Sequence, residues 1–352
     1  MQKVADTRLL TLDAMRGLAA IAVILFHLDF IGPFAPSGYL AVDFFFLMSG
    51  FVIARAYEDR LSNGLTFTGF FIERMIRLYP VYILGLCIGL LRRVAQIATD
   101  HPDRLSISEL GISTIFNLLM LPSPATDEIA PINGPSWSLF FELIVNVVWA
   151  TVLVKASRKI LTTYVAFLAL LLIAAITETG SAQPGWTWTE LHYGFIRSFF
   201  GFGFGVLLSK LIQQRRTRPS LISVFAATAL CVLLVAGVQP KYRAAYDLIS
   251  ILVCFPIIVI AGITFNPPLQ LKEFSRTLGD ISYPLYLVHF APLFTISFLA
   301  RKYDVSPLLW IPSFIFGVCF LSLYIARSYD VIARKYLSRI LLRRKEKSSS
   351  SA

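Results

Sequence analysis

Charged residues are scarce in this 352-residue sequence, where Asp, Glu, Lys and Arg together make up 15% of the chain. A soluble domain of ordinary composition carries about 25% charged residues, whereas 56% of this chain is hydrophobic. The mean hydropathy of +0.69 reflects the same imbalance. Apolar runs recur with the ~20 residues that a helix needs to cross about 30 Å of hydrocarbon. This pattern excludes a soluble globular protein and predicts a polytopic membrane protein.

Cysteine is also rare, and all four cysteines fall inside apolar runs: Cys87, Cys231, Cys254 and Cys319. Residues placed in this way do not form a disulfide framework, and none of them has the spacing of a zinc site. We therefore expect these side chains to fill space in the core, and we expect no bound metal.

The net charge of +11 would suggest nucleic acid as the partner of a soluble protein. Here the cations gather in alternate loops and in the tail between Arg334 and Lys347. That distribution is typical of cytoplasmic loops that face anionic lipid. No basic patch is interleaved with aromatic residues, so we exclude nucleic acid and expect the lipid bilayer as the partner.

The hydrophobic runs predict an all-α bundle of about ten transmembrane helices. We place these spans near residues 10–31, 39–57, 75–92, 136–154, 161–177, 193–209, 220–237, 246–264, 280–299 and 307–327. A shorter, more polar segment, Ser106–Leu121, is predicted to be interfacial or re-entrant. If it crossed, most of the 32 Lys and Arg residues would face outward, against the positive-inside rule. Both termini are then cytoplasmic, with a membrane domain over 1–330 and a basic cytoplasmic tail over 331–352.

Ionisable residues inside a span are costly and usually mark function. Arg16 and His27 lie eleven residues apart in the first span. On a helix they differ by about 20° and lie ~16 Å apart along one face, which Asp13 shares. A snorkelling arginine and a structural histidine are the alternative reading.

Two carboxylates belong to the same outer zone of the predicted membrane domain. Asp43 would lie at a depth similar to that of His27, about 6 Å below the outer boundary, and Glu142 about 10 Å below it. A carboxylate at that depth could orient His27, although capping of a helix N-terminus would also explain Asp43. Ser138 shares a helical face with Glu142 because the two are four residues apart.

Four further polar residues are candidates on weaker grounds. Arg74 and Arg77 precede a span at its cytoplasmic start and form a plausible fork for phosphate groups. Arg197 places a cation near the outer leaflet, and His289 lies near mid-membrane. Structural roles for these residues remain open at this point. Trp186, in an outer loop, is either an interfacial anchor or part of a sugar-stacking surface.

Taken in order, the motifs LDAMRG with its histidine, DFFFLMSGF, RMIRLYP, PSWSLFFE and SYPLYLVH resemble the acyltransferase-3 family. The resemblance extends from Leu12 to about Tyr329. It implies a multi-pass enzyme of the bacterial inner membrane that O-acylates glycans outside the cytoplasm. Some family members carry a second, soluble domain, which we do not expect here. The alternative function is a transporter or flippase of a polar substrate, which would more often show internal repeats.

The resemblance also implies roles for individual residues. Arg16 and His27 become the activity-linked pair, and Arg74 and Arg77 help to bind an acyl-coenzyme A donor, with acetyl as the expected acyl group. Trp137, Ser138 and Glu142 are assigned to the site. We add Arg197 and His289 as candidate contacts of the acceptor, a glycan or glycolipid.

Two chemical routes remain open for this predicted site. His27 could act as the general base for a glycan hydroxyl, with Asp43 or Glu142 orienting it. It could instead form an acyl-histidine intermediate in two half-reactions.

Overall fold

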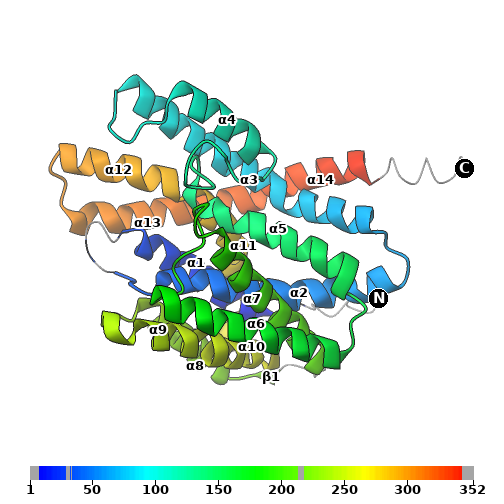
Figure 1. Ribbon diagram of the computed structural model, residues 1–352. Helices are drawn as coiled ribbons and strands as arrows, with labels where there is room; N and C mark the ends of the chain where they lie inside the picture. Colours follow the sequence, from blue (N-terminus) through cyan, green and yellow to red (C-terminus); the bar gives the residue numbers. More distant parts are fainter. Residues whose placement is uncertain (1–7, 29–31, 33, 213–217, 343–352) are drawn as a thin grey trace, which may run out of the picture.

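The computed structural model describes residues 8–28, 32, 34–212 and 218–342, and within them the chain is almost entirely helical (Figure 1). The two short strands, β1 (Arg218–Pro219) and β2 (Phe265–Asn266), pair in parallel. The α-helices are α1 (Leu10–Phe26), α2 (Ala41–Ser62), α3 (Phe67–Ala98), α4 (Ile107–Leu118), α5 (Trp137–Val148), α6 (Arg158–Thr179), α7 (Leu191–Leu211), α8 (Ile222–Val235), α9 (Pro240–Ile249), α10 (Phe255–Thr264), α11 (Lys272–Val288), α12 (Phe290–Lys302), α13 (Pro307–Tyr324) and α14 (Asp330–Leu341). Short 3-10 or π-helical turns are η1 (Gly38–Leu40), η2 (Gly134–Ser136), η3 (Trp149–Leu153), η4 (Ser250–Cys254), η5 (Leu269–Leu271) and η6 (Ile325–Tyr329).

Among the described residues, seven helical segments are long and apolar enough to cross a membrane. They cover Gly38–Ser62, Phe67–Ala98, Gly134–Leu153, Arg158–Thr179, Leu191–Leu211, Pro240–Thr264 and Pro307–Leu341. The pair α11 and α12 adds one bent candidate. α1 has 17 residues and α8 has 14, so both are shorter than these segments. The multi-pass helical architecture predicted from the sequence is thus confirmed, while residues 29–31 of the first predicted span lie outside the described residues.

The predicted span over 280–299 is not one straight helix. It is broken at His289, where α11 and α12 meet at 67°. Pro292 explains the break, because it has no N–H to bond the carbonyl of Val288 and its ring crowds that carbonyl. The last predicted span, in contrast, continues without a break to Leu341, well past residue 330.

The segment Ser106–Leu121 forms the short helix α4, which lies beside α3 at the edge of the bundle (Figure 1). Ser106 and Glu109 form a capping box at its start. The helix has 12 residues and therefore extends for only about 18 Å, too little to cross a bilayer alone.

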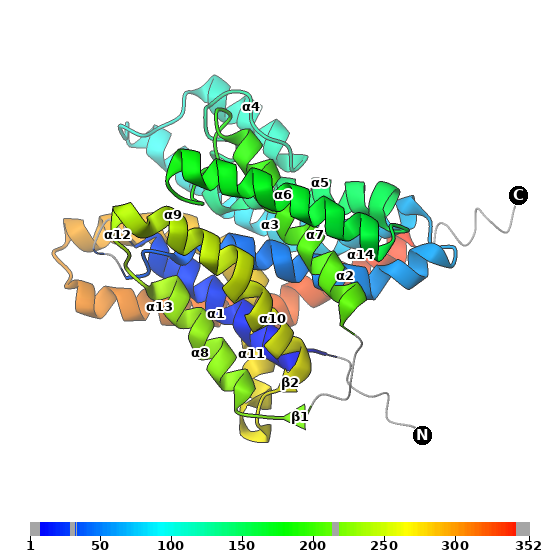
Figure 2. The same ribbon diagram turned by 60° about the horizontal axis from the view of Figure 1, so that its bottom comes forward.

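α1 occupies the centre of the molecule and contacts α2, α8, α10 and α11 (Figure 2). Glycines permit its close approach to α11. A Cβ atom on Gly279 would lie 2.6 Å from the Cβ of Asp13, and one on Gly17 would lie 2.6 Å from the Cβ of Leu278. Small residues at a helix interface allow this contact, which positions the polar residues of both helices against each other.

Candidate active site

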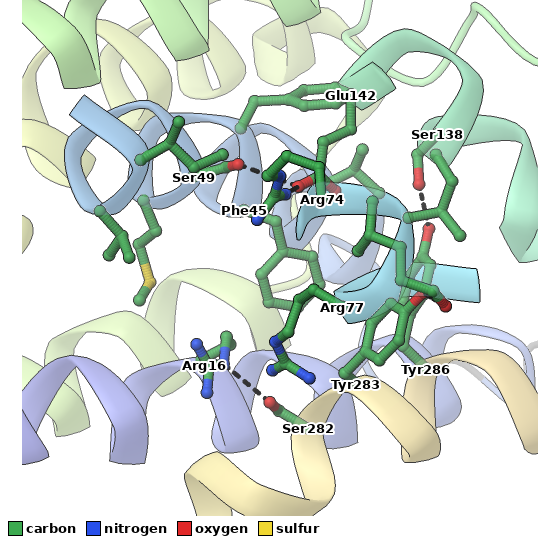
Figure 3. Close-up of a pocket in the computed structure, with 17 residues that line it drawn as sticks. Arg16, Phe45, Ser49, Arg74, Arg77, Ser138, Glu142, Ser282, Tyr283 and Tyr286 are labelled. Carbon is green, nitrogen blue, oxygen red and sulfur yellow. Dashed lines mark hydrogen bonds and ion pairs between the residues drawn. The ribbon is translucent and has the colours of Figure 1, made fainter. Parts of the chain in front are cut away.

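A cavity with about 950 Å³ of empty space opens between α1, α2, α3, α5 and α11 (Figure 3). Three arginines, Arg16, Arg74 and Arg77, contribute to its wall, and we call it the arginine cavity. The other polar residues that line it are Ser49, Ser138, Glu142, Ser282, Tyr283 and Tyr286. Sequence motifs that are far apart in the chain therefore meet around one space.

Arg74 and Glu142 form an ion pair across this cavity, with Nη2 2.8 Å from Oε1. Ser49 donates a second hydrogen bond to the same oxygen over 3.0 Å. Among the described residues, no group accepts a hydrogen bond from the buried Nε of Arg74. Because a buried donor without a partner is costly, an acceptor atom of a ligand in this cavity would be stabilised there.

Arg16 and Arg77 lie together on the opposite wall (Figure 3). Arg16 donates from Nε to the hydroxyl of Ser282 over 2.8 Å and pairs with Asp13 over 3.1 Å. Nη1 of Arg77 lies 3.6 Å from a carboxylate oxygen of Asp330. The side chains of Arg16 and Arg77 remain 30% and 38% exposed, so both can be reached by an anionic ligand.

A second cavity, with about 1040 Å³ of empty space, lies at the other end of α1. His27 lines it, and we call it the histidine cavity. Its wall is mainly aromatic and includes Phe26, Tyr39, Trp137, Trp186, Tyr286, Phe290 and Phe294, with Glu128, Gln183 and Arg197 as polar members.

The imidazole of His27 contacts a second imidazole. Nδ1 of His27 lies 3.1 Å from Nε2 of His289, whose Nδ1 lies 2.9 Å from the carbonyl oxygen of Leu285. Phe290 packs edge-on against His27, with 5.1 Å between the ring centroids. His289 is fully buried and is not among the described residues that line either cavity, so its predicted contact with the acceptor stays a prediction.

Tyr286 and Val42 line both cavities and form a partition between them. The hydroxyl of Tyr286 donates to the carbonyl oxygen of Pro135 over 2.8 Å. It also lies 2.9 Å from the hydroxyl of Ser138. These bonds hold the phenol ring in place at the point where the two spaces approach each other.

The structure pairs neither predicted carboxylate with His27. Asp43 instead binds Arg197 through two hydrogen bonds of 3.0 and 2.7 Å, and both side chains are buried. Arg197 also donates to the carbonyl oxygen of Pro184 over 2.8 Å and so fastens the loop between α6 and α7 to α2 and α7. This pair is a structural clamp beside the histidine cavity.

The depths predicted for Glu142 and Arg74 also need correction, because the two side chains form a direct ion pair. The sequence had placed them at opposite ends of the membrane domain. α3 begins at Phe67, so Arg74 lies about 10 Å along the helix axis and not at its start.

Sequence reasoning missed Ser49, Ser282 and Tyr286, which complete the two hydrogen-bonding clusters and the partition. A signal for two of them was present. Ser282, Tyr286 and His289 are spaced i, i+4 and i+7, which puts them on one face of a helix.

Comparison with known proteins identifies a family. The model of an acyltransferase domain matches residues 9–327. The protein named "Protein 2 in picA locus" from Rhizobium radiobacter is 37% identical over 194 residues, which are 51% of this chain and all of that protein.

Longer alignments connect the chain to proteins whose names refer to glycans. Peptidoglycan O-acetyltransferase OatA of Listeria monocytogenes is 27% identical over 82% of this chain, which spans about half (49%) of that protein's length. Exopolysaccharide production protein ExoZ of Rhizobium meliloti is 25% identical over 75% of this chain and 78% of its own. No solved structure matches.

Proposed function

This chain belongs to the acyltransferase-3 family, and from that membership we propose that it transfers an acyl group, acetyl in the simplest case, across the membrane. The chain is an acyl-transferring enzyme. The donor in this proposal is cytoplasmic acyl-coenzyme A, and the acceptor is a hydroxyl of a glycan outside the cytoplasm. The observation that carries the proposal is the pair of chemically different cavities that share Tyr286 and Val42.

The arginine cavity suits the donor. Coenzyme A carries phosphates, and guanidinium groups bind phosphate through charge-assisted, often bidentate hydrogen bonds. Arg16 and Arg77 are reachable, and the Nε of Arg74 lacks a partner among the described residues. The bound phosphates would stay at the mouth of the cavity, while the thioester end extends toward Tyr286.

The histidine cavity suits a sugar. Aromatic faces such as those of Trp137, Trp186 and Phe290 present apolar, rigid surfaces, and Glu128 and Gln183 add polar groups. The relatives named for peptidoglycan and exopolysaccharide support a glycan as the acceptor. A glycan hydroxyl in this cavity could reach His27, which lines it.

The proposed chemical step uses His27 as a base. Its Nε2 takes the proton of the glycan hydroxyl while the hydroxyl oxygen attacks the thioester carbon. The carbon–sulfur bond breaks, and the thiolate of coenzyme A takes the proton back from His27. An acyl-histidine route would use the same nitrogen as a nucleophile.

The proposed topology has about ten spans in a bacterial inner membrane, with both termini on the cytoplasmic side. α1 and α8 would then count as spans, together with α11 and α12 as one broken span. Arg16 would face the cytoplasm, and His27 would face the outside. Broken helices are tolerated at membrane depth where they are buried in protein or line a cavity, as at His289.

The test uses purified protein in vesicles that are sorted by orientation. Acyl-coenzyme A on the face of the termini should acylate a glycan on the opposite face, and mass spectrometry of the glycan identifies the acyl group. Transfer that requires both substrates on one face would refute the transmembrane route. Movement of glycan without any gain in mass would favour the flippase alternative.

A further inference from the structure

Apart from the proposed substrate contacts, the site contains a hydrogen bond between two histidines, His27 and His289. His289 lies at the break between α11 and α12, and its side chain is 0% exposed. His27 lies at the end of α1 and is partly exposed to the histidine cavity. The two residues are 262 positions apart in the chain, yet their ring nitrogens are 3.1 Å apart.

The partner of the other ring nitrogen determines the tautomer of His289. A carbonyl oxygen can only accept a hydrogen bond, so the Nδ1 that lies 2.9 Å from the oxygen of Leu285 must carry a proton. Among the described residues, no carboxylate forms an ion pair with His289 or His27. A buried imidazolium without a counter-charge is costly, so His289 is neutral. Its Nε2 is then unprotonated and carries a lone pair that can accept a hydrogen bond.

The same logic then determines the tautomer of His27. If Nε2 of His289 can only accept, Nδ1 of His27 must donate across the 3.1 Å contact. In a neutral imidazole the remaining nitrogen, Nε2, is then unprotonated. The backbone of Val23 is a second hydrogen-bond partner of the His27 imidazole, and its carbonyl oxygen, like that of Leu285, can only accept from a ring N–H.

We infer that His289 is a positioning residue, which accepts a hydrogen bond from Nδ1 of His27 and so keeps Nε2 of His27 available to receive a proton. The inference rests on the proposed function for its chemical meaning, but the hydrogen bond itself does not depend on it. When His27 gains a proton at Nε2, the same lone pair of His289 stabilises the imidazolium. Packing by Phe26 and Phe290, whose ring centroids lie 5.4 and 5.1 Å from that of His27, holds the ring in this orientation.

The role resembles the way in which buried groups orient catalytic imidazoles in general, except that the acceptor here is neutral. It applies to both chemical routes, because a base and a nucleophile need the same free nitrogen. It also explains why a polar side chain is completely buried at the break in the helix.

The direct experiment measures the tautomer. The chain has four histidines, so replacing the two at other sites, His101→Gln and His192→Gln, leaves His27 and His289. Nitrogen-15 NMR of histidine-labelled protein in bilayers should show His27 protonated at Nδ1 and unprotonated at Nε2. Protonation of His27 at Nε2 in this otherwise native protein would overturn the inference, without any need for a variant to fold.

Two matched variants connect the tautomer to catalysis. His289→Phe keeps the volume of the ring without the acceptor, and His289→Gln places an amide oxygen near the position of the lost nitrogen. We expect His289→Phe to lower kcat by roughly 10²-fold or more, the lower end of what loss of a general base costs. KM for both substrates should change little, and His289→Gln should recover most of kcat together with the Nδ1–H tautomer.

The outcomes separate this inference from the proposed function. Unchanged kcat and an unchanged tautomer in His289→Phe would refute the positioning role. The expected tautomer in a wild-type protein that transfers no acyl group would refute the proposed function and leave the hydrogen bond in place. A loss of kcat in His289→Phe that His289→Gln does not reverse, with the tautomer preserved in both, would assign His289 to packing alone.

Discussion

Substitution of the two α3 arginines should separate donor binding from stability. Arg77 lies 3.6 Å from a carboxylate oxygen of Asp330, and its guanidinium also packs over the ring of Tyr283, 5.6 Å from the centroid; its side chain is 38% exposed and that of Asp330 8%. Asp330 keeps Arg334 as a second partner when Arg77 is removed. Partly exposed pairs of this kind contribute about 0–1 kcal/mol to stability. Arg77→Ala should therefore leave the melting temperature almost unchanged while removing one contact to the phosphates of the donor.

The size of the binding effect follows from the chemistry of that contact. A hydrogen bond to a charged group contributes about 1.5–3 kcal/mol, which corresponds to roughly 10–150-fold in donor affinity. We would measure it by calorimetry with a thioether analogue of acyl-coenzyme A, which cannot transfer its acyl chain. An acylated pantetheine without phosphates is the matched ligand, and Arg77→Ala should bind it as the wild type does.

Arg74→Ala should behave differently, because Arg74 is 11% exposed in its side chain and is the ion-pair partner of Glu142. Removing one member of a buried pair costs about 3–5 kcal/mol, and the 20% exposure of Glu142 puts the expected loss at or below the lower limit. The double variant Arg74→Met, Glu142→Met should recover stability but not donor affinity. If Arg74→Ala and Arg77→Ala both bound the coenzyme A analogue with wild-type affinity, the arginine cavity would not be the donor site.

Three further outcomes follow from the same structure. His27→Ala should lower transfer by about 10²–10⁴-fold at equal expression and equal thermal stability; full activity would remove His27 from the mechanism. Gly279→Ala should destabilise the protein by about 1–3 kcal/mol through crowding between α1 and α11, because the new Cβ would lie 2.6 Å from that of Asp13; an unchanged melting temperature would show that the contact relaxes. After removal of the native cysteines, a cysteine at Lys302 should react with an impermeant thiol reagent in intact cells, and one at Asn63 should not; the reverse pattern would invert the proposed topology.

The sequence was sufficient to predict features that depend on local order along a helix. The spacing of Arg16 and His27 placed them at two ends of one helical face, and in the structure they line separate cavities at the two ends of α1. Pro292 would also have predicted the break at His289, had its missing N–H been weighed against the long apolar run.

Pairings between helices could not be predicted in this way. Glu142 and Arg74 are 68 residues apart, and their contact depends on where each helix starts and how deeply it inserts. The predicted start of this helix was about two turns too late, which displaced the predicted position of Arg74 by about 10 Å along the helix axis. The ion pair with Glu142 was therefore not predicted. For the same reason the sequence predicted a carboxylate as the partner of His27. In the structure its partner is His289, which follows α11 late in the chain.

In the proposed function, acyl transfer between the cavities requires the Tyr286 partition to open, whichever chemical route is used, because His27 lies beyond it from the arginine cavity. The phenol is held by two hydrogen bonds, to Pro135 and Ser138. Neutral hydrogen bonds contribute about 1 kcal/mol each, so the two bonds together add about 2 kcal/mol to the cost of opening. A state raised by that energy alone would be populated at a few per cent, within the range of minor states that ligands select. In the proposed route the partition would therefore be open for a few per cent of the time, and for the remaining time it would separate the thioester from a hydroxyl or water molecule in the histidine cavity.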